Sequence, residues 1–366
     1  MSDRPKMPRI PWIALLAKKI YQIVYTIYKA RMSGVWLRKE ARIVLWIPSL
    51  TPTIYFRGGL FIKDLALIKS LKERSLPFTV HVGLKIGKYN NCVIFYHLSD
   101  RYNVYSFNNH MSAWEYISEQ LEKQRNLVFY TSREIKYWEN KIYMYDKFAE
   151  YGIPHPRTRI IEEITDLQDK DVSFPLLVKD MHSRGSQGIF KINDLNELKE
   201  LIESPAAKQK NNGKFIVQEL LNMRRDLRVI VVGEEIVLHY WRINKTDAWL
   251  PTSTGFGSEV DFDDFPEAWR NHIVTTFKKL GITTGAFDIA WQNDDLSLPP
   301  LYLEVSPSYQ PNPKPLQKVE YYGLWKKSFS MVNNYDKAYI DLVFEIEDKY
   351  LEECLKLVKQ KTNFDL

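Results

Sequence analysis

Two strand-like runs late in the chain, each carrying one carboxylate, constrain the fold most. Residues 285–291 and 301–305 are apolar runs that contain Asp288 and Glu304, and a turn-rich stretch ending in Pro-Pro separates them. An antiparallel hairpin centred near Leu296 would make the two carboxylates cross-strand neighbours about 5 Å apart, where like charges repel. The pair therefore predicts either a bound cation, with Mg²⁺ on a nucleotide phosphate as the natural candidate, or a polar edge hairpin in solvent.

The length of 366 residues exceeds one ordinary core and predicts two or three domains. Cys92 and Cys354 lie far apart and form neither a disulfide framework nor a metal-ligand spacing. This cysteine usage fits a reducing compartment and predicts a cytoplasmic protein.

The N-terminal segment, residues 1–41, accounts for the net positive charge of the chain. Residues 1–42 hold ten basic and two acidic residues, which gives this stretch a net charge of +8. The whole chain has a net charge of +6, so the remaining residues sum to −2. The body is therefore not predicted to bind nucleic acid. Apolar residues in this segment recur at helical spacing, namely Ile13, Leu16, Ile20, Ile23 and Ile27.

Lys18 and Lys19 interrupt this apolar run, so it does not predict a helix that crosses a bilayer. Two interpretations stay open. The helix packs on the body of the protein or on a second subunit of a homodimer, or it lies on an anionic membrane surface as a basic amphipathic helix. The second interpretation would place the protein peripherally at the inner face of the membrane. Nucleic-acid binding by this segment is the least favoured alternative.

Strands and helices alternate over residues 42–132, which predicts a small α/β domain with a largely parallel sheet. Its predicted strands are 42–47, 78–82, 92–97 and 126–130, and its predicted helices are 62–74 and 111–123. A helix over 133–151 follows and ends at Gly152.

Two further modules follow. The pattern over residues 133–220 predicts four strands, at 158–161, 174–179, 189–192 and 214–218. It also predicts a helix that begins after Asp194 and an exposed turn at 208–213. Residues 221–315 predict a hairpin turning at Gly233, a loop over 244–264, a helix over 266–280 and the carboxylate hairpin. Residues 316–366 add a helix over 336–361. The predicted class is α/β (α+β).

Lys179 ends an apolar strand and is followed by a loop, 182–188, that contains two glycines. Backbone N–H groups of such a loop can approach a polyphosphate, with the lysine as a point charge. The alternatives are a lysine that extends to solvent and a hairpin loop that binds nothing. The strand over 215–221 then leads into a linker, where a planar base could bind; a plain buried strand with Glu219 at its exposed end is the other interpretation.

The order of these motifs over roughly residues 130–315 resembles the ATP-grasp superfamily, most closely its RimK-like and D-alanine–D-alanine-ligase-like branches. The motifs are Asn140-Lys141, 152–156, 175–179 with its glycine loop, 217–221, 226–232, Phe287-Asp288 and 303–307. The resemblance implies an ATP-grasp fold: an N-terminal α/β domain, a central lid subdomain, a strand-rich subdomain with the metal site, and a helical extension.

The resemblance also implies a nucleotide site. Lys141 and Lys179 would contact the α- and β-phosphates, and Asp226 would contact the ribose. The lid loop would include Gly185, Ser186 and Gly188. The adenine would be held by Gln218, Glu219, Leu220 and Leu221.

By the same resemblance, Arg228 and Arg242 would meet the transferred phosphoryl group, and Asp288 and Glu304 would hold one or two Mg²⁺. Two alternatives stay open: Arg228 simply pairs with Asp226, or Arg242 is a surface residue at a strand end. The family usually has Glu-x-Asn where this chain has Glu304-Val-Ser306. Either Ser306 or Asn312 could be the third metal ligand.

The implied activity is that of an ATP- and Mg²⁺-dependent carboxylate–amine ligase that forms an amide through an acyl-phosphate. Its substrates would be small molecules, an amino acid or small peptide and an amino- or carboxyl-bearing acceptor; the N-terminal helix suggests a cell-surface polysaccharide precursor. Two other classes stay open: a kinase on the same fold, and a nucleotide-binding scaffold without turnover.

Overall fold

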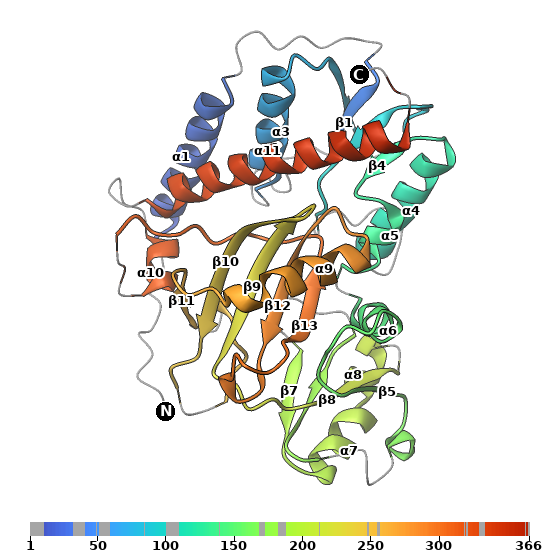
Figure 1. Cartoon of the computed structure of the whole chain (residues 1–366), viewed down its shortest axis with the longest axis vertical. Helices are drawn as coiled ribbons and strands as arrows, with labels where there is room; N and C mark the ends of the chain where they lie inside the picture. Colours follow the sequence, from blue (N-terminus) through green and yellow to red (C-terminus); the bar gives the residue numbers. More distant parts are fainter. Residues whose placement is uncertain are drawn as a thin grey trace. The chain divides into compact units, whose positions relative to one another are not determined.

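The chain divides into two compact units (Figure 1). The first unit comprises residues 136–281 and 285–306, and the second unit comprises the remaining described residues. The computed structural model describes residues 11–31, 41–48, 50, 59–83, 85–99, 110–138, 140–167, 173–181, 188–211, 213–246, 249–254, 257–317, 319, 321–328, 334–362 and 364. None of the helices in these ranges is long and apolar enough to cross a membrane.

A four-stranded sheet in the order β2-β1-β3-β4 forms the centre of the second unit. Its strands are β1 (Ile43–Ile47), β2 (Phe78–Val82), β3 (Val93–Phe95) and β4 (Leu127–Phe129), and all three pairings are parallel. Strand β1, Ile-Val-Leu-Trp-Ile, is buried at every position, as expected for a parallel strand covered on both faces. The predicted parallel sheet is confirmed.

The helices of the second unit are α1 (Trp12–Ala30), α3 (Leu60–Glu73), α4 (His110–Lys123), α5 (Ser132–Ile135), α10 (Tyr322–Lys327) and α11 (Tyr335–Lys361). Helix α11 packs against α3 and α1. The predicted N-terminal helix is present, but its buried residues are Gln22, Thr26 and Ala30 rather than the apolar set. It therefore packs on its own chain through its polar face, which the spacing of apolar residues does not predict.

A group of charged side chains, called here the imidazole cluster, joins three elements of the second unit. It consists of His97, Asp64, Glu347 and Lys63. His97 follows β3, and its ring nitrogens contact Asp64 Oδ1 of α3 at 2.7 Å and Glu347 Oε2 of α11 at 3.1 Å. Lys63 Nζ lies 3.7 Å from Glu347 Oε1. Burial alone would lower the pKa of His97, but the Glu347 and Asp64 carboxylates raise it to about 9.

The first unit contains two sheets. The smaller one is antiparallel in the order β5-β8-β6-β7. Its strands are β5 (Thr158–Ile161), β6 (Leu176–Lys179), β7 (Ile189–Ile192) and β8 (Phe215–Glu219), accompanied by the helices α7 (Leu195–Glu203) and α8 (Pro205–Asn211). Asp194 caps α7 by accepting from the N–H groups of Asn196 and Glu197, as its position before the helix predicts.

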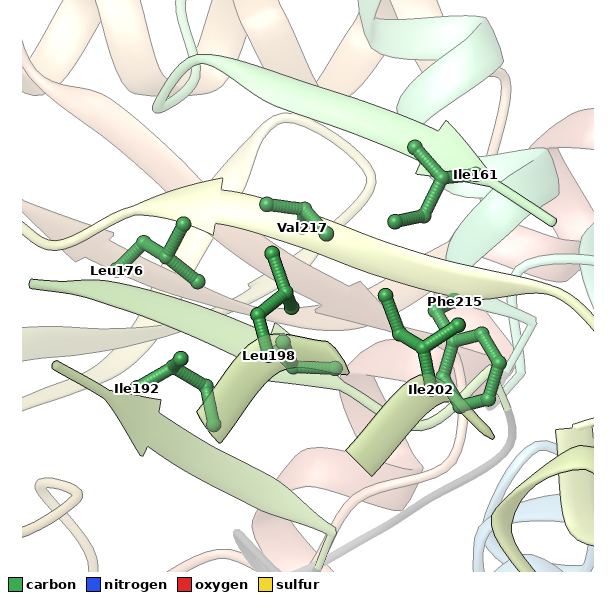
Figure 2. Close-up of a cluster of buried hydrophobic side chains, with 8 residues drawn as sticks. Ile161, Leu176, Ile192, Leu198, Ile202, Phe215 and Val217 are labelled. Carbon is green, nitrogen blue, oxygen red and sulfur yellow. The ribbon is translucent and has the colours of Figure 1, made fainter. Parts of the chain in front are cut away.

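Helix α7 and the smaller sheet share one apolar core (Figure 2). Its buried side chains are Ile161, Leu176, Val178, Ile192, Leu198, Ile202, Phe215 and Val217. Burying each such side chain stabilises the fold by about 1.5–3 kcal/mol. The core fixes β6 and β8, the strands that end at Lys179 and at Gln218-Glu219.

The larger sheet has the order β11-β10-β9-β12-β13. Its strands are β9 (Arg225–Val232), β10 (Glu235–Ile243), β11 (Glu259–Asp261), β12 (Thr284–Ala290) and β13 (Leu301–Ser306), and helix α9 (Arg270–Leu280) precedes β12. Gly233 turns the β9–β10 hairpin with φ +58°, a left-handed conformation that favours glycine. Asp288 pairs with Glu304 across β12 and β13, so the predicted register is confirmed.

Three local predictions are wrong. The predicted helix over 133–151 is two helices, α5 and α6 (Lys141–Glu150), because Asn140 begins a new helix by accepting from Tyr143 N–H. The predicted turn over 208–213 is helical as far as Asn211, and the predicted loop over 244–264 contains β11. The division of the chain into five segments stays a prediction.

Candidate functional site

Four adjacent strands of the larger sheet bring charged side chains to one face. Arg242 on β10 pairs with Asp226 on β9, and Asp288 on β12 pairs with Glu304 on β13. Arg228 lies two residues beyond Asp226 and so shares its face, because side chains alternate along a strand. Strands β9 and β12 are neighbours, which joins the two pairs into one row of charges.

The guanidinium cluster, defined as Arg228, Arg242, Asp226 and Asp288, is closely hydrogen bonded. Arg228 donates through Nε and Nη2 to the two oxygens of Asp288 at 2.7 and 2.9 Å. Arg242 Nη2 lies 2.8 Å from Asp288 Oδ2, and Arg242 Nε donates to Asp226 Oδ1 at 2.8 Å. Arg242 therefore bridges the two aspartates.

This geometry decides two open alternatives. Arg228 pairs with Asp288, so the simple pair with Asp226 is wrong. Arg242 is buried, so its interpretation as a surface residue is also wrong. The physical reason is the lateral order of the sheet, which places β12 beside β9.

The surroundings of the two aspartates shift their pKa values in opposite directions. Burial alone would raise the pKa of Asp288, but Arg228 and Arg242 hold it at about 2. Burial raises the pKa of Asp226, and Arg242 opposes that change. Asp288 is therefore ionised at every physiological pH, as a carboxylate that binds a cation must be.

Lys179 is buried at the end of β6 rather than extended to solvent. Its Nζ donates to Tyr145 Oη at 3.2 Å. Burial lowers the pKa of Lys179 to about 8, while Glu304 and Asp288 act in the opposite direction. A bound anion such as phosphate would restore the charged form, since an opposite charge nearby favours it.

A cleft within the first unit collects these groups. Its charged lining includes Lys179, Asp226, Arg242, Asp288 and Glu304. Its apolar lining includes Leu220, Leu221, Met223, Trp249 and Leu250. An apolar wall beside a few convergent charges is the usual composition of a small-molecule site.

Tyr145 is a residue of this site that motif reasoning missed. Its Oη accepts from Lys179 Nζ and from Gln218 Nε2 at 2.9 Å, and donates to Leu303 O at 2.9 Å. Its position offers one signal, because it lies four residues after Lys141 on the same face of α6. Trp249 was also missed; its aromatic character in a loop was the only hint.

The remaining nucleotide-site candidates have well-defined environments. Lys141 is buried at the first position of α6, where its N–H donates to Met181 O at 3.3 Å. Glu219 accepts from Arg157 N and Nε, both at 2.8 Å. Gly188 has φ +71°, and a Cβ there would lie 2.0 Å from Asp180 Oδ2, so only glycine fits. Gly185 and Ser186 lie outside the described residues.

Two carboxylates are available to a metal ion. Glu304 is half-buried, and no residue in the described ranges makes a hydrogen bond or ion pair with its carboxylate. Asp288 Oδ1 accepts one hydrogen bond and keeps a lone pair. These two groups fit Mg²⁺, which keeps several waters and needs only one or two carboxylates beside phosphate oxygens. The part of the chain described by the structure contains no cluster of three or more His, Cys, Asp or Glu that could cage a metal.

The third metal ligand stays a prediction. Ser306 is half-buried, two residues beyond Glu304 on β13. Asn312 belongs to the second unit, where it is buried and accepts from Lys326 Nζ at 3.3 Å.

The family described as RimK-like ATP-grasp domain matches residues 139–250. Residues 139–250 thus resemble a RimK-like ATP-grasp domain. The match includes Lys141, Lys179 and the β9–β10 hairpin, and ends before Asp288 and Glu304. The ATP-grasp resemblance is thereby confirmed.

Two curated proteins share part of this ATP-grasp region. The alpha-aminoadipate–LysW ligase LysX of Saccharolobus solfataricus is 28% identical over 126 residues, which cover 33% of this chain and 45% of that protein. The coenzyme gamma-F420-2:alpha-L-glutamate ligase of Methanocaldococcus jannaschii is 27% identical over 101 residues, 26% of this chain and 35% of that protein. The chain thus spans less than half of the length of either relative.

Solved structures show the same fold over a longer range. The D-alanine–D-alanine ligase of Bacillus anthracis has a TM-score of 0.54 at 13% identity and covers 88% of this chain and 100% of its own. The ATP-grasp ligase PsnB, solved with precursor peptide PsnA2 and AMPPNP, has a TM-score of 0.53 at 12% identity and covers 86% of this chain and 99% of its own. At this identity the likeness shows the ATP-grasp fold, which confirms the predicted fold class.

Proposed function

We propose that this protein is an ATP- and Mg²⁺-dependent ligase that joins a carboxylate to an amine through an acyl-phosphate. One observation carries the proposal: Lys179, Arg242, Asp288 and Glu304 line a single cleft that also has an apolar wall. Cations and cation-binding carboxylates side by side suit a triphosphate with its metal, and the apolar wall suits a base.

The charged groups would divide the work. Lys179 would bind phosphate oxygens, and Asp288 with Glu304 would hold Mg²⁺, which when bound would neutralise charge on the triphosphate. Arg228 and Arg242 would stabilise the transferring phosphoryl group. When this group enters, an Arg242 N–H can turn from Asp288 to a phosphoryl oxygen, which leaves Asp288 freer to bind the cation.

The need for phosphoryl transfer follows from the carboxylate substrate. A free carboxylate is a poor acyl donor because oxide would be the leaving group. Transfer of the γ-phosphoryl group to a carboxylate oxygen gives an acyl-phosphate and ADP. The amine then attacks the carbonyl carbon, loses a proton, and expels phosphate as the amide forms.

The substrates are proposed from the relatives. The names of both curated relatives contain an amino acid, alpha-aminoadipate in one and L-glutamate in the other. PsnB was solved with a precursor peptide. We therefore propose an amino acid or small peptide as one substrate, and an amino- or carboxyl-bearing acceptor as the other.

The test is phosphate release across a matrix of amino acids, short peptides and sugar acids, with mass spectrometry of the products. The expected result is ADP and phosphate formed only when a carboxylate and an amine are both present. The product should have the summed mass of the two substrates minus one water. A stable phosphorylated product formed without an amine would show a kinase instead. Tight ATP binding without turnover on any pair would show a nucleotide-binding scaffold.

A further inference from the structure

Helix α1 presents its apolar side away from the protein. Trp12, Ile20, Val24 and Tyr28 have exposed fractions of 72%, 53%, 61% and 77%. Ile13, Leu16 and Ile27 are exposed on the same side, at spacings of three and four residues. A helix of 19 residues is about 28 Å long, so the apolar stripe runs along a substantial surface.

Polar contacts fix this orientation. Asp336 of α11 accepts a hydrogen bond from Gln22 Nε2 at 2.8 Å, and its carboxylate lies 3.2 Å from Lys18 Nζ. Asp341 of α11 accepts hydrogen bonds from Tyr25 Oη at 2.9 Å and from Lys29 Nζ at 2.5 Å. The inward face of α1 is thus held at two points, one turn or more apart, and the outward face is left apolar.

We propose that this outward face of α1 docks the protein onto the surface of a bilayer that contains anionic lipid, with the helix lying in the plane of the interface. The proposal is independent of the ligase chemistry. Helices that bind in this way have an apolar face, a basic surround and too little apolar length to cross the bilayer.

Charge favours anionic lipid over a second copy of the chain. Residues 1–42 carry a net +8. Lys18 and Lys29 are paired with Asp336 and Asp341, but further basic residues lie before and after the helix in the sequence. An isologous dimer through α1 would bring two such segments together, whereas an anionic surface complements each of them. Trp12 and Tyr28, near opposite ends of the helix, have the amphipathic rings that membrane–water interfaces favour.

The experiment is co-sedimentation of the full chain with two kinds of vesicle, phosphatidylcholine alone and phosphatidylcholine mixed with phosphatidylglycerol. We expect binding to the mixed vesicles to be at least about tenfold stronger, and to weaken with salt. Ile20→Ser together with Val24→Ser should abolish it. The matched control is Ile160→Ser together with Leu298→Ser, two partly exposed apolar residues of the first unit, and this variant should bind like the wild type.

Two outcomes would overturn the proposal. One is equal vesicle binding by the wild type and the α1 variant. The other is a wild-type dimer, seen by light scattering, that the α1 substitutions make monomeric while neither form binds vesicles; the face would then be a subunit interface. Unchanged thermal unfolding and lipid-free phosphate release by the α1 variant would show that its fold and catalytic site are intact, so loss of docking is separable from loss of the ligase function.

Discussion

The guanidinium cluster and the imidazole cluster both pair two buried carboxylates with two cations, yet they differ in what surrounds them. In the imidazole cluster, both ring nitrogens of His97 are bonded to carboxylates from two different helices, so the charges join elements of the second unit. In the guanidinium cluster, Arg242 and both aspartates also line a cleft, beside Lys179 and beside Glu304, which has no hydrogen-bond or ion-pair partner among the described residues. Buried charge alone therefore does not mark a site; charged groups that face a cleft beside an unsatisfied one do.

The largest effect is expected at the bridge of the guanidinium cluster. Arg242→Met leaves Asp226 and Asp288 buried without their shared partner. We expect the free energy of unfolding to fall by about 3–5 kcal/mol and phosphate release to fall by about 10²–10³-fold. Urea unfolding and steady-state phosphate release measure the two. Adding Asp226→Asn should restore stability only; recovery of activity as well would contradict a role for Arg242 in phosphoryl transfer.

The corresponding change in the imidazole cluster should affect stability alone. Glu347→Gln removes one of the two carboxylates of His97 and the partner of Lys63. We expect a loss of about 3–5 kcal/mol in the free energy of unfolding, since a buried charge loses its partner. Phosphate release per folded molecule, measured well below the melting temperature, should not change. A tenfold fall there would mean that the two clusters are not functionally distinct.

Glu304→Gln should give the opposite result to Glu347→Gln: a loss of activity with little change in stability. Its carboxylate has no partner among the described residues, so the free energy of unfolding should change by less than about 1 kcal/mol. Phosphate release should fall by about 10²–10³-fold, because one of the proposed metal ligands is lost. The exposed surface variant Glu267→Gln is the control and should keep full activity. A large loss of stability in Glu304→Gln would show that Glu304 is structural.

Between pH 6.5 and 9, stability should depend on pH through only one of the clusters. The folded pKa of His97, about 9, lies above its ordinary value of 6.5. Its contribution is therefore complete below about pH 6.5 and is lost as the pH rises through 9, amounting to about 3 kcal/mol. Comparing urea unfolding of the wild type and His97→Gln between these pH values isolates it. Arginine stays charged over this range and Asp288 is already ionised there, so the guanidinium cluster adds no such dependence between these pH values. A parallel pH dependence in both proteins would refute this assignment.

The smallest effect concerns nucleotide affinity. With a pKa of about 8, Lys179 loses its charge above that pH. The affinity for Mg-ATP should therefore fall by up to about tenfold between pH 8 and 9, as measured by calorimetry. Lys179→Arg should remove this pH dependence, because arginine remains protonated. A flat profile in the wild type would indicate that Lys179 does not contact the nucleotide.

Local patterns predicted much of the fold and part of the candidate site. The turn-rich stretch around Leu296 placed Asp288 opposite Glu304, because hairpin register follows from the turn. The apolar strand before Lys179 placed that lysine at the end of β6. The parallel sheet of the second unit followed from alternating strands and helices.

Lateral and tertiary contacts could not be predicted in the same way. The bridge from Arg242 to Asp288 depends on β9 lying beside β12, strands more than 50 residues apart along the chain. The packed face of α1 was missed because ion pairs to Asp336 and Asp341 override the apolar stripe. Periodicity identifies the two faces of a helix, but it does not say which face the rest of the chain will bind.

The hydrogen bonds of Tyr145 have a consequence for how the cleft responds to its ligands. The phenolic oxygen makes all the hydrogen bonds it can. It accepts from Lys179 at the proposed phosphate end and from Gln218 at the proposed base end, and it donates to the backbone of the strand that carries Glu304. If Lys179 swings toward an incoming phosphate, that oxygen gains a free lone pair and Gln218 can reorient. Occupancy at one end of the cleft would thus be communicated to the other through a single atom.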